Sequence, residues 1–390
     1  MLKRLLRIIL ILPVMLCTFG VQAVHADNGM TANISSDYAI VMDQNTSQVL
    51  SEKNADERMY PASLTKMMTA ILAMENLTDY SETITITSPM FAGLYEQNAS
   101  MAGFQVGDEP TVEDIFYGIA LPSGADACNA AAITISGNVS SFVDLMNQKA
   151  QEIGMTNTHF VNTTGLHDEN HYSTARDMAL LLQYCLKNEE FVKVFSSRTY
   201  TTSSLASAPN GIQLQSTTWP KAMRYGISLP GMAGVKTGFT YPAGRCMAYW
   251  ADINDMHLVI VTAHAPENEE GTMALFDANA LLNILQSWNK QNLMKKGDTI
   301  QKVTVKYPFH SETVSIKAPE TVTMDVSDSA DIKVTTNIPS EITMSKSSES
   351  YKTDITITVD DQSVYTGKTT LKVDDANFFE KIVLGIRNLF

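Results

Sequence analysis

The sequence has few cysteines and few basic residues, and each shortage excludes a class of protein. Four cysteines are spread over 390 residues, and Cys17 lies in an apolar N-terminal run. The others, Cys128, Cys185 and Cys246, are odd in number and far apart, so buried thiols are predicted rather than a disulfide framework or a zinc site. Lys and Arg number 28 against 42 Asp and Glu, and the net charge is −14. The chain therefore lacks the basic excess with which nucleic-acid-binding proteins neutralise phosphates.

Residues 1–26 carry the features of a secretory signal. Basic residues open the segment, an apolar run over 8–19 follows, and Ala26 closes a small-residue cleavage site. The run of about 12 residues is shorter than the ~20 residues that span a bilayer. We therefore predict that this signal is removed near Asp27 and that the protein is exported.

The region from 39 to 288 mixes strand patterns with helix patterns. Residues 39–43 and 48–51 flank a polar turn and predict a hairpin. Residues 62–75 are rich in Leu, Met and Ala and lack Gly and Pro, which predicts a helix buried on all sides. Further helices are predicted over 112–117, 126–135, 140–153, 174–186 and 276–288. Strands are predicted over 234–237, 246–253 and 257–263, the last two joined by a tight turn at Asn254-Asp255.

The composition changes after Lys295. Thr, Ser, Val and Lys alternate, and no Cys or Trp follows Trp288. Residues 297–374 are therefore predicted to form a separate all-β domain of short strands. The expected division is a signal peptide over 1–26, a catalytic domain over 27–295, a β-rich domain over 296–375 and a terminal helix over 376–390.

The terminal segment 376–390 is amphipathic. It is too short to span a bilayer but suits a helix lying in the membrane interface. The alternative is a helix packed on its own domain. Its apolar residues fall on one helical face, and they are Phe378, Phe379, Ile382, Val383, Ile386 and Phe390.

The segment Ser63-Leu-Thr-Lys66 places a hydroxyl and an amine three positions apart on a predicted helix. Residues at this spacing share a helix face, so the two groups are expected within hydrogen-bond reach. A serine nucleophile needs a neighbouring base, and a lysine serves when burial and nearby cations lower its pKa. This short motif is common by chance and identifies nothing alone.

Two further motifs follow in the chain, Ser123-Gly-Ala125 and Lys236-Thr-Gly238. In this order the three motifs resemble those of the penicillin-recognising serine enzymes. The chain is more narrowly similar to the low-molecular-mass penicillin-binding proteins of the D-alanyl-D-alanine carboxypeptidase family. Phe160-x-Asn162-x-x-Gly165-Leu166 and the run over 171–179 support the narrower match.

The resemblance implies an α/β (α+β) fold of the β-lactamase/transpeptidase type. Such a fold has an antiparallel sheet flanked by helices, a helical subdomain and, here, a C-terminal all-β sandwich-like domain. It also implies a reaction. Ser63 is expected to attack the carbonyl of the penultimate D-alanine, Lys66 to act as its base, and Ser123 to pass a proton to the departing D-alanine.

The third motif is expected to bind substrate. The resemblance assigns the substrate carboxylate to Lys236 and Thr237, and the charge of Lys236 also favours a neutral Lys66. Gly238 allows close approach of the backbone. The amides of Ser63 and Phe239 are expected to form the oxyanion hole.

One position departs from the family pattern, because Ala125 stands where a third-position Asn is usual. The missing amide normally contacts the catalytic lysine and the substrate. Asp126 is adjacent but is expected to point elsewhere, and Tyr241 and Arg245 are expected either to line the site or to make surface contacts. His167 and His171 are four apart in a predicted loop, so we predict no metal site from them.

The resemblance implies peptidoglycan pentapeptide stems as substrate, β-lactams as covalent inhibitors, no cofactor, and a place at the outer face of the bacterial membrane or in the cell-wall space. A membrane surface is the expected partner of the terminal helix. The alternatives are an endopeptidase that cleaves peptide crosslinks, a β-lactamase, and a weakly active peptidoglycan-binding protein. No loop Glu in a recognisable deacylation motif supports the β-lactamase.

Overall fold

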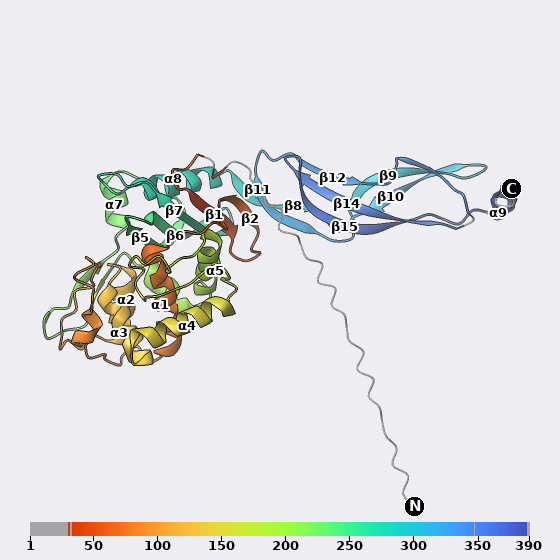
Figure 1. The fold of residues 1–390 in the computed structure, drawn as a ribbon. Coiled ribbons are helices and arrows are strands. Elements are labelled where there is room, and N and C mark those ends of the chain that lie inside the picture. The colour runs from red at the N-terminus through yellow and green to blue at the C-terminus, as the bar shows by residue number, and fades with distance from the viewer. Residues whose placement is uncertain (1–29, 32, 347, 388–390) are drawn as a thin grey trace, which may run out of the picture.

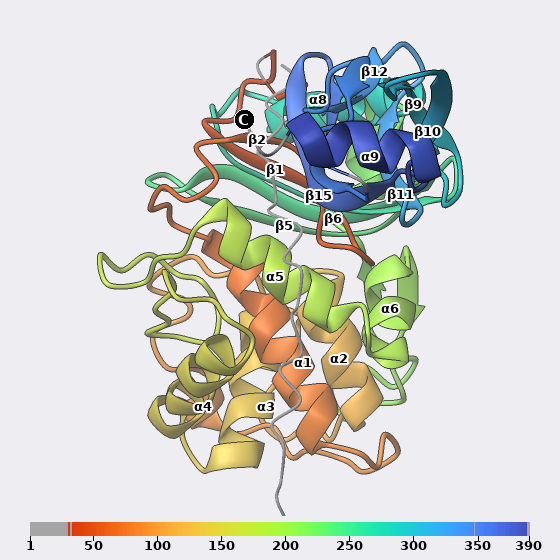
Figure 2. The same cartoon turned by 90° about the vertical axis from the view of Figure 1, so that its right-hand side faces the viewer.

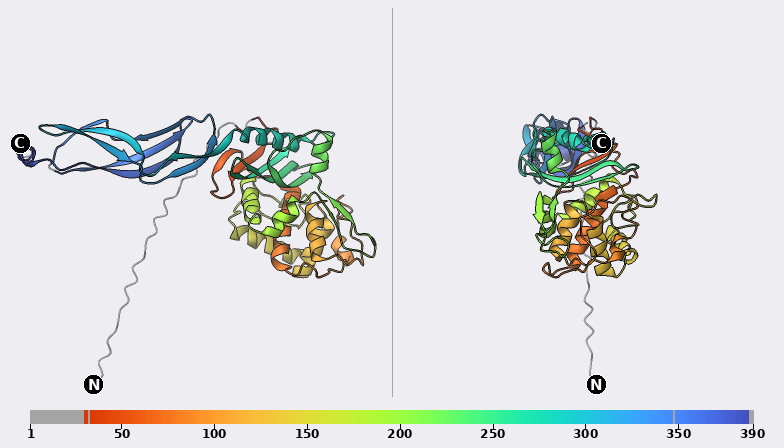
Figure 3. Two further views of the ribbon diagram at one scale, coloured as in Figure 1. Left: turned by 180° about the vertical axis from the view of Figure 1, so that it is seen from behind. Right: turned by 90° about the vertical axis from the view of Figure 1, so that its left-hand side faces the viewer.

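The computed structural model describes residues 30–31, 33–346 and 348–387, so the predicted signal peptide lies outside the described residues. An α/β part extends from the first described residues to residue 285. A long β-rich part extends away from it and ends in the helix α9, as Figures 1 and 3 show.

A five-stranded antiparallel sheet forms the centre of the α/β part, with the strand order β2-β1-β7-β6-β5. The N-terminal hairpin thus pairs with strands from much later in the chain. The predicted hairpin is confirmed, as is the turn at Asn254 and Asp255, whose φ angles of 49° and 64° suit a tight turn. The strands are β1 (Tyr38–Asp43), β2 (Val49–Lys53), β5 (Met232–Thr240), β6 (Gly244–Ile253) and β7 (Met256–Ala265).

Alternation along β6 explains why both faces of this sheet are covered. Ala248 and Trp250 pack into the core of the helical subdomain, whereas Met247 and Tyr249 pack toward α8 on the other face. Figure 2 shows the helical subdomain on one side of the sheet and α8 on the other. The helices are η1 (Ala62–Thr65), α1 (Lys66–Asn76), α2 (Val112–Ala120), α3 (Ala125–Ser136), α4 (Val139–Glu152), α5 (Ala175–Cys185), α6 (Glu189–Ser196), α7 (Trp219–Arg224) and α8 (Met273–Leu285).

The structure differs from the sequence prediction at several element ends. The long helix predicted over 62–75 opens with the 3-10 turn η1, and α8 ends at Leu285 instead of continuing to Trp288. Trp288 begins a strand, because its backbone pairs with a distant segment whose position the local pattern does not reveal. Four short elements were not predicted, since each is too short for a periodic signal: η2 (Ser88–Phe91), α7, β3 (Thr199–Thr201) and β4 (Gln213–Gln215). The helix α6 was also missed.

The β-rich part confirms the predicted all-β character. It holds a β10-β9-β13 sheet, a β12-β14-β15 sheet and the pair β11-β8. Among the described residues no helix is long and apolar enough to cross a membrane. The elements are β8 (Trp288–Met294), β9 (Thr299–Lys306), β10 (Ser311–Lys317), β11 (Val322–Ser327), β12 (Ile332–Thr336), β13 (Glu341–Thr343), β14 (Ser350–Val359), β15 (Gln362–Lys372) and α9 (Phe378–Arg387).

Two buried carboxyl groups meet where the two parts join. Asp43 at the end of β1 is fully buried, and Asp325 of β11 is 1% exposed. The Lys290 ammonium lies 3.4 Å from Asp43 and 3.8 Å from Asp325. Burial opposes ionisation of Asp43, but hydrogen bonds from Thr46 and Asp325 outweigh it and lower the pKa of Asp43. Burial and the neighbouring Asp43 raise the pKa of Asp325 to about 7.

This raised pKa predicts a pH-dependent stability. Asp325 keeps its proton in the folded state up to about pH 7, whereas the unfolded carboxyl releases it near its ordinary value of 3.8. Unfolding therefore releases a proton in this window, and the contribution of Asp325 to stability falls as the pH rises from about 4 to about 7. We expect Asp325→Asn to raise the melting temperature more at pH 8 than at pH 5, because the amide never ionises. An equal shift at both pH values, or the same behaviour in the exposed control Asp298→Asn, would contradict this origin.

Candidate active site

Ser63 and Lys66 stand at the junction of η1 and α1. Ser63 is partly exposed, and Lys66 is 2% exposed. The Lys66 Nζ lies 2.9 Å from the Ser63 Oγ, as the three-residue spacing predicts, and it also donates to the Thr164 carbonyl at 2.6 Å. The Thr164 contact fixes the amine beside the hydroxyl.

A second serine-lysine pair joins the second and third motifs. Lys236 Nζ donates to the Ser123 Oγ at 2.8 Å and to the Thr237 carbonyl at 2.7 Å. Ser123 has a φ of 62°, an uncommon backbone conformation for a residue with a side chain. The strained backbone at Ser123 thus places its hydroxyl beside Lys236.

Burial shifts the pKa of both lysines downward. Desolvation lowers the pKa of Lys66, with Cys128 and Asp126 acting in the opposite direction. Desolvation lowers the pKa of Lys236 well below its ordinary value, and the charge of Lys66 lowers it further. Because repulsion between two cations is mutual, a charged Lys236 also favours a neutral Lys66. Both shifts favour the neutral amine over the ammonium form.

Two glycines enclose the Ser63 amide. A Cβ on Gly238 of β5 would lie 2.8 Å from the Ser63 nitrogen, and a Cβ on Gly165 would lie 2.9 Å from it. Gly165 also has a φ of +79°, and its Cβ would meet the Ala62 carbonyl oxygen at 1.7 Å. Only glycine suits either position, so the backbone around Ser63 stays free of side chains.

Asn162 shapes the loop that carries Thr164 and Gly165. Its Oδ1 accepts hydrogen bonds from the amides of Gly165 at 2.7 Å and Thr164 at 3.1 Å, and its Nδ2 donates to the Leu166 carbonyl at 2.9 Å. This turn presents the Thr164 carbonyl to Lys66. The motif over 160–166 therefore supports the site, although its side chains are not part of the two serine-lysine pairs.

Comparisons with known proteins identify the family of the chain. The family model for peptidase S11, D-alanyl-D-alanine carboxypeptidase, matches residues 21–267. The chain belongs to the D-alanyl-D-alanine carboxypeptidase family. It is a serine peptidase by that membership, and the fold expected from the sequence is confirmed by the solved structures.

The relatives of this carboxypeptidase cover most of the chain. The D-alanyl-D-alanine carboxypeptidase DacF of Bacillus subtilis is 35% identical over 311 residues, which are 78% of this chain and 76% of the relative. Penicillin-binding protein 5 of Haemophilus influenzae shares the fold with a TM-score of 0.62 and 24% identity, over 88% of this chain and 97% of its own. The Streptomyces K15 DD-transpeptidase has a TM-score of 0.58 and 27% identity, over 64% of this chain and 96% of its own.

His171 of the carboxypeptidase is buried next to the site and joins η1 to the loop that precedes Asn162. Its Nδ1 accepts from the Val161 amide at 3.1 Å, so its Nε2 carries the proton and donates to the Thr65 hydroxyl at 2.7 Å. Burial lowers the pKa of His171 to about 3, which keeps the ring neutral at physiological pH. Both ring nitrogens are thus engaged, while His167 is exposed against the Tyr60 ring. In the ranges 30–31, 33–346 and 348–387, no group of three or more His, Cys, Asp or Glu side chains is placed to hold a metal ion.

Ala125 is buried at the first position of α3, and its amide donates to the Ser100 carbonyl at 2.7 Å. Asp126 does not replace the missing amide, as predicted, because its carboxylate accepts from the amides of Ala102 at 2.7 Å and Gly103 at 3.0 Å. Asn129, one turn later, was missed by the sequence analysis. It accepts from the Thr163 hydroxyl at 2.7 Å and so reaches the loop beside Lys66.

The structure places the three cysteines in the interior and Tyr241 and Arg245 beside the third motif. Cys128, Cys185 and Cys246 are buried free thiols, as expected. Tyr241 is 88% exposed and packs edge-on against Phe239 at 5.4 Å. The Arg245 guanidinium lies 4.2 Å above the Phe239 ring and pairs with Glu267, so these side chains form the rim beside the third motif.

Thr217 is a rim residue that the sequence analysis missed. Its hydroxyl lies 2.9 Å from the hydroxyl of Thr237 in the third motif. Nothing in the local sequence marks Thr217, because it follows the short strand β4 and approaches β5 only in the folded chain. The hydrogen bond restricts rotation of the Thr237 hydroxyl.

We expect Thr217→Val to raise KM about 2- to 10-fold with little change in kcat, because one hydrogen bond that orients Thr237 is lost. Steady-state kinetics on a D-alanyl-D-alanine peptide measure the two constants separately. The exposed Thr199→Val serves as the control. An unchanged KM would show that Thr237 needs no such support.

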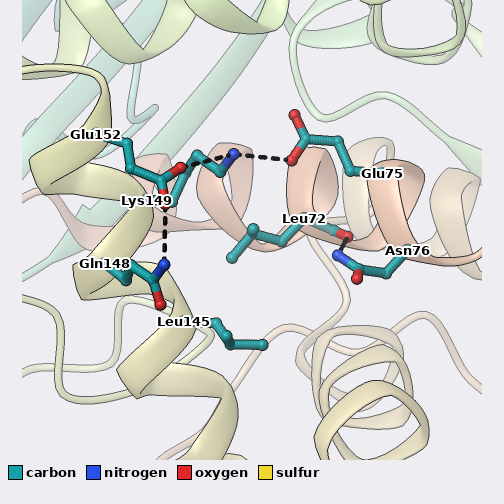
Figure 4. A pocket seen from close by; sticks show the side chains of 7 residues that line it. All are labelled: Leu72, Glu75, Asn76, Leu145, Gln148, Lys149 and Glu152. Atoms are coloured by element: carbon teal, nitrogen blue, oxygen red, sulfur yellow. Dashed lines mark hydrogen bonds and ion pairs between the residues drawn. The ribbon is translucent and has the colours of Figure 1, made fainter. Parts of the chain in front are cut away.

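A surface pocket of about 300 Å³ lies away from Ser63, at the C-terminal end of α1 (Figure 4). Lys149 on its wall lies 3.2 Å from both Glu75 and Glu152. Burial opposes the charge of Lys149, but the hydrogen bonds to Glu152, Tyr184 and Glu75 prevail and raise its pKa. The charged side chains that line the pocket form ion pairs with one another between α1 and α4. We therefore do not assign a ligand to this pocket.

Proposed function

We propose that the protein is an exported serine D-alanyl-D-alanine carboxypeptidase that removes the terminal D-alanine of peptidoglycan stem peptides through a Ser63 acyl-enzyme. The observation that carries this proposal is the buried Lys66 amine, held 2.9 Å from the Ser63 hydroxyl by the Thr164 carbonyl. A lysine so placed and desolvated has the properties of a general base. Family membership supports the same reaction.

Acylation begins when neutral Lys66 accepts the Ser63 proton and the Ser63 oxygen attacks the carbonyl carbon of the penultimate D-alanine. The amides of Ser63 and Phe239 stabilise the oxyanion. The space that Gly165 and Gly238 leave around the Ser63 amide supports this assignment. Ser123 then gives a proton to the departing nitrogen, the C–N bond breaks, and D-alanine leaves as a free amino acid.

Lys236 and Thr237 bind the carboxylate of the terminal D-alanine in this proposal, Lys236 by its charge and Thr237 by a hydrogen bond. The Lys236 ammonium also donates a hydrogen bond to the Ser123 Oγ at 2.8 Å. The proton that Lys66 took from Ser63 replaces the one that Ser123 gives up, which leaves Lys236 charged and Lys66 neutral. Water hydrolyses the acyl-enzyme to the shortened peptide and Ser63. A β-lactam presents a similar carbonyl and carboxylate, and covalent inhibition by β-lactams is characteristic of the family.

We further propose that the enzyme acts outside the cytoplasmic membrane, with a catalytic unit over 27–295, a β-rich unit over 296–375 and a membrane-surface helix over 376–390. β8 links the two larger units because it pairs with β11. The helix α9 lies across the end of the molecule that is remote from the sheet, as Figures 1 and 2 show. Its Phe378 and Phe379 are 72% and 69% exposed, which favours a lipid contact on this face of the helix.

The decisive experiment measures free D-alanine released from diacetyl-L-lysyl-D-alanyl-D-alanine by the chain from residue 27, with Ser63→Ala as control. We expect release by the wild type and none by the variant. Penicillin labelling of Ser63 without D-alanine release would support the endopeptidase instead. Absence of both would leave a peptidoglycan-binding protein.

A further inference from the structure

The turn between β9 and β10 displays one exposed aromatic ring. Phe309 is 65% exposed. The turn is rigid, because the Tyr307 amide donates to the His310 carbonyl at 2.9 Å and Pro308 restricts φ next to Phe309. The rings of Tyr307 and His310 stack across its base, with centroids 4.4 Å apart. Phe309 is therefore held at the tip with its ring in solvent.

A single carboxylate joins this turn to α9. The Glu380 side chain has no exposed surface, and its Oε1 accepts from the His310 Nδ1 at 2.7 Å and the Phe309 amide at 3.4 Å. Its Oε2 accepts from the Asn377 amide at 3.0 Å, while the Asn377 Oδ1 accepts from the Glu380 amide at 3.1 Å. This reciprocal pair is a capping box. Glu380 thus fixes both the start of α9 and its place beside Phe309.

The same contacts set the rotation of α9. Glu380 and Leu384 lie one turn apart and are both buried against the β-rich part. The opposite face of the helix therefore points away from the protein. Of the nearby acidic groups, Glu380 is buried, and the exposed Asp375 lies 3.5 Å from Lys381. The outward face is apolar, and its exposed residues are Phe378, Phe379, Ile382 and Ile386.

We infer that the β9–β10 turn and α9 form one lipid-binding surface, in which Phe309 enters the membrane interface beside the apolar face of α9. This inference rests on the membrane association proposed above and adds a second element to it. A lipid surface suits the site because the helix lies across the end of the elongated molecule (Figure 2), where a flat bilayer reaches helix and turn together. Exposed aromatic and aliphatic side chains on one face are the composition that such an interface accepts.

A fluorescent label at the turn tests whether position 309 enters the membrane interface. The described cysteines are all buried, so Phe309→Cys carries the one accessible thiol of the mature chain and takes an environment-sensitive dye. We expect brighter, blue-shifted emission when vesicles of phosphatidylglycerol and phosphatidylcholine are added. Ser329→Cys is the matched control, because Ser329 is exposed near the other end of the β-rich part, beside Asp328, whose amide contacts the Ser287 carbonyl. Equal responses at the two positions would overturn the inference.

Binding to the same vesicles tests whether the contacts of Glu380 with Phe309 and His310 hold the turn beside α9. Phe309→Ser should weaken vesicle binding about tenfold, since the transfer of one aromatic ring is lost. His310→Ala leaves the Asn377–Glu380 capping box intact, and it should weaken binding without adding to the effect of Phe309→Ser. If the wild type binds vesicles and neither variant differs from it, α9 acts alone and the inference fails. If the wild type does not bind, membrane association itself fails, while D-alanine release still tests the carboxypeptidase.

Discussion

Lys66→Met should lower the rate of acylation by a β-lactam ~10²–10⁴-fold, which is the usual contribution of a general base. Methionine fills a similar volume and has no basic group, so the buried site keeps its packing. The Ser63 hydroxyl then keeps its proton, and the Thr164 carbonyl loses its donor. Stopped-flow measurement with a fluorescent penicillin gives the acylation rate directly.

The pH dependence of acylation identifies the base. Burial lowers the pKa of Lys66 below its ordinary 10.5. The neutral amine is the active form, so the wild-type rate should rise with pH through this lowered pKa and then level off. Lys66→Met should show no such rise, and the exposed Lys187→Ala should behave as the wild type. A wild-type rate in Lys66→Met would assign the base to another group.

Gly165→Ala should lower acylation about 100-fold or more, because a displacement of about 1 Å at a reacting group has effects of this size. Its methyl group would lie 1.7 Å from the Ala62 carbonyl oxygen and 2.9 Å from the Ser63 amide. The loop over 162–166 must move away from η1, and its Thr164 carbonyl then leaves Lys66. Thermal unfolding and acylation rates measured together separate loss of fold from loss of alignment.

Gly154→Ala is the matched control for this effect. Gly154 has a φ of +87°, close to that of Gly165, but a Cβ there would have no atom within 4 Å. The variant should lose only about 1–2 kcal/mol of stability from backbone strain and should acylate normally. If both variants lose activity equally, conformational strain rather than the collision at Ala62 is responsible.

Much of the architecture was predictable from local patterns. The hairpin of β1 and β2, the helices α1 to α5, and the strands β5 to β7 follow periodicities of one element at a time. The prediction failed where the backbone conformation depends on a strand partner far along the chain. Trp288 continues the apolar pattern of α8, yet it begins β8 because β11 offers it hydrogen bonds.

The catalytic motifs were predictable for a different reason. Ser63 and Lys66 are three residues apart, so helix geometry alone brings the hydroxyl and the amine together. That Ser123 and Lys236 belong to one site was implied only by family resemblance, since 113 positions separate them, and their hydrogen bond was not predicted. Thr217 and Asn129 carried no local signal at all.

The sequence by itself determined the order of the three motifs, the contact of Ser63 with Lys66, the amphipathic pattern of α9 and the alternation that builds the central sheet. These properties depend on neighbours within a turn of helix or two positions of a strand. Only the tertiary structure decided the Thr164 contact that holds Lys66, the burial of Asp325 beside Asp43, and the contact of Glu380 with the Phe309 turn. Each of these joins segments that meet only when the whole chain packs, and burial then changes what their charges can do.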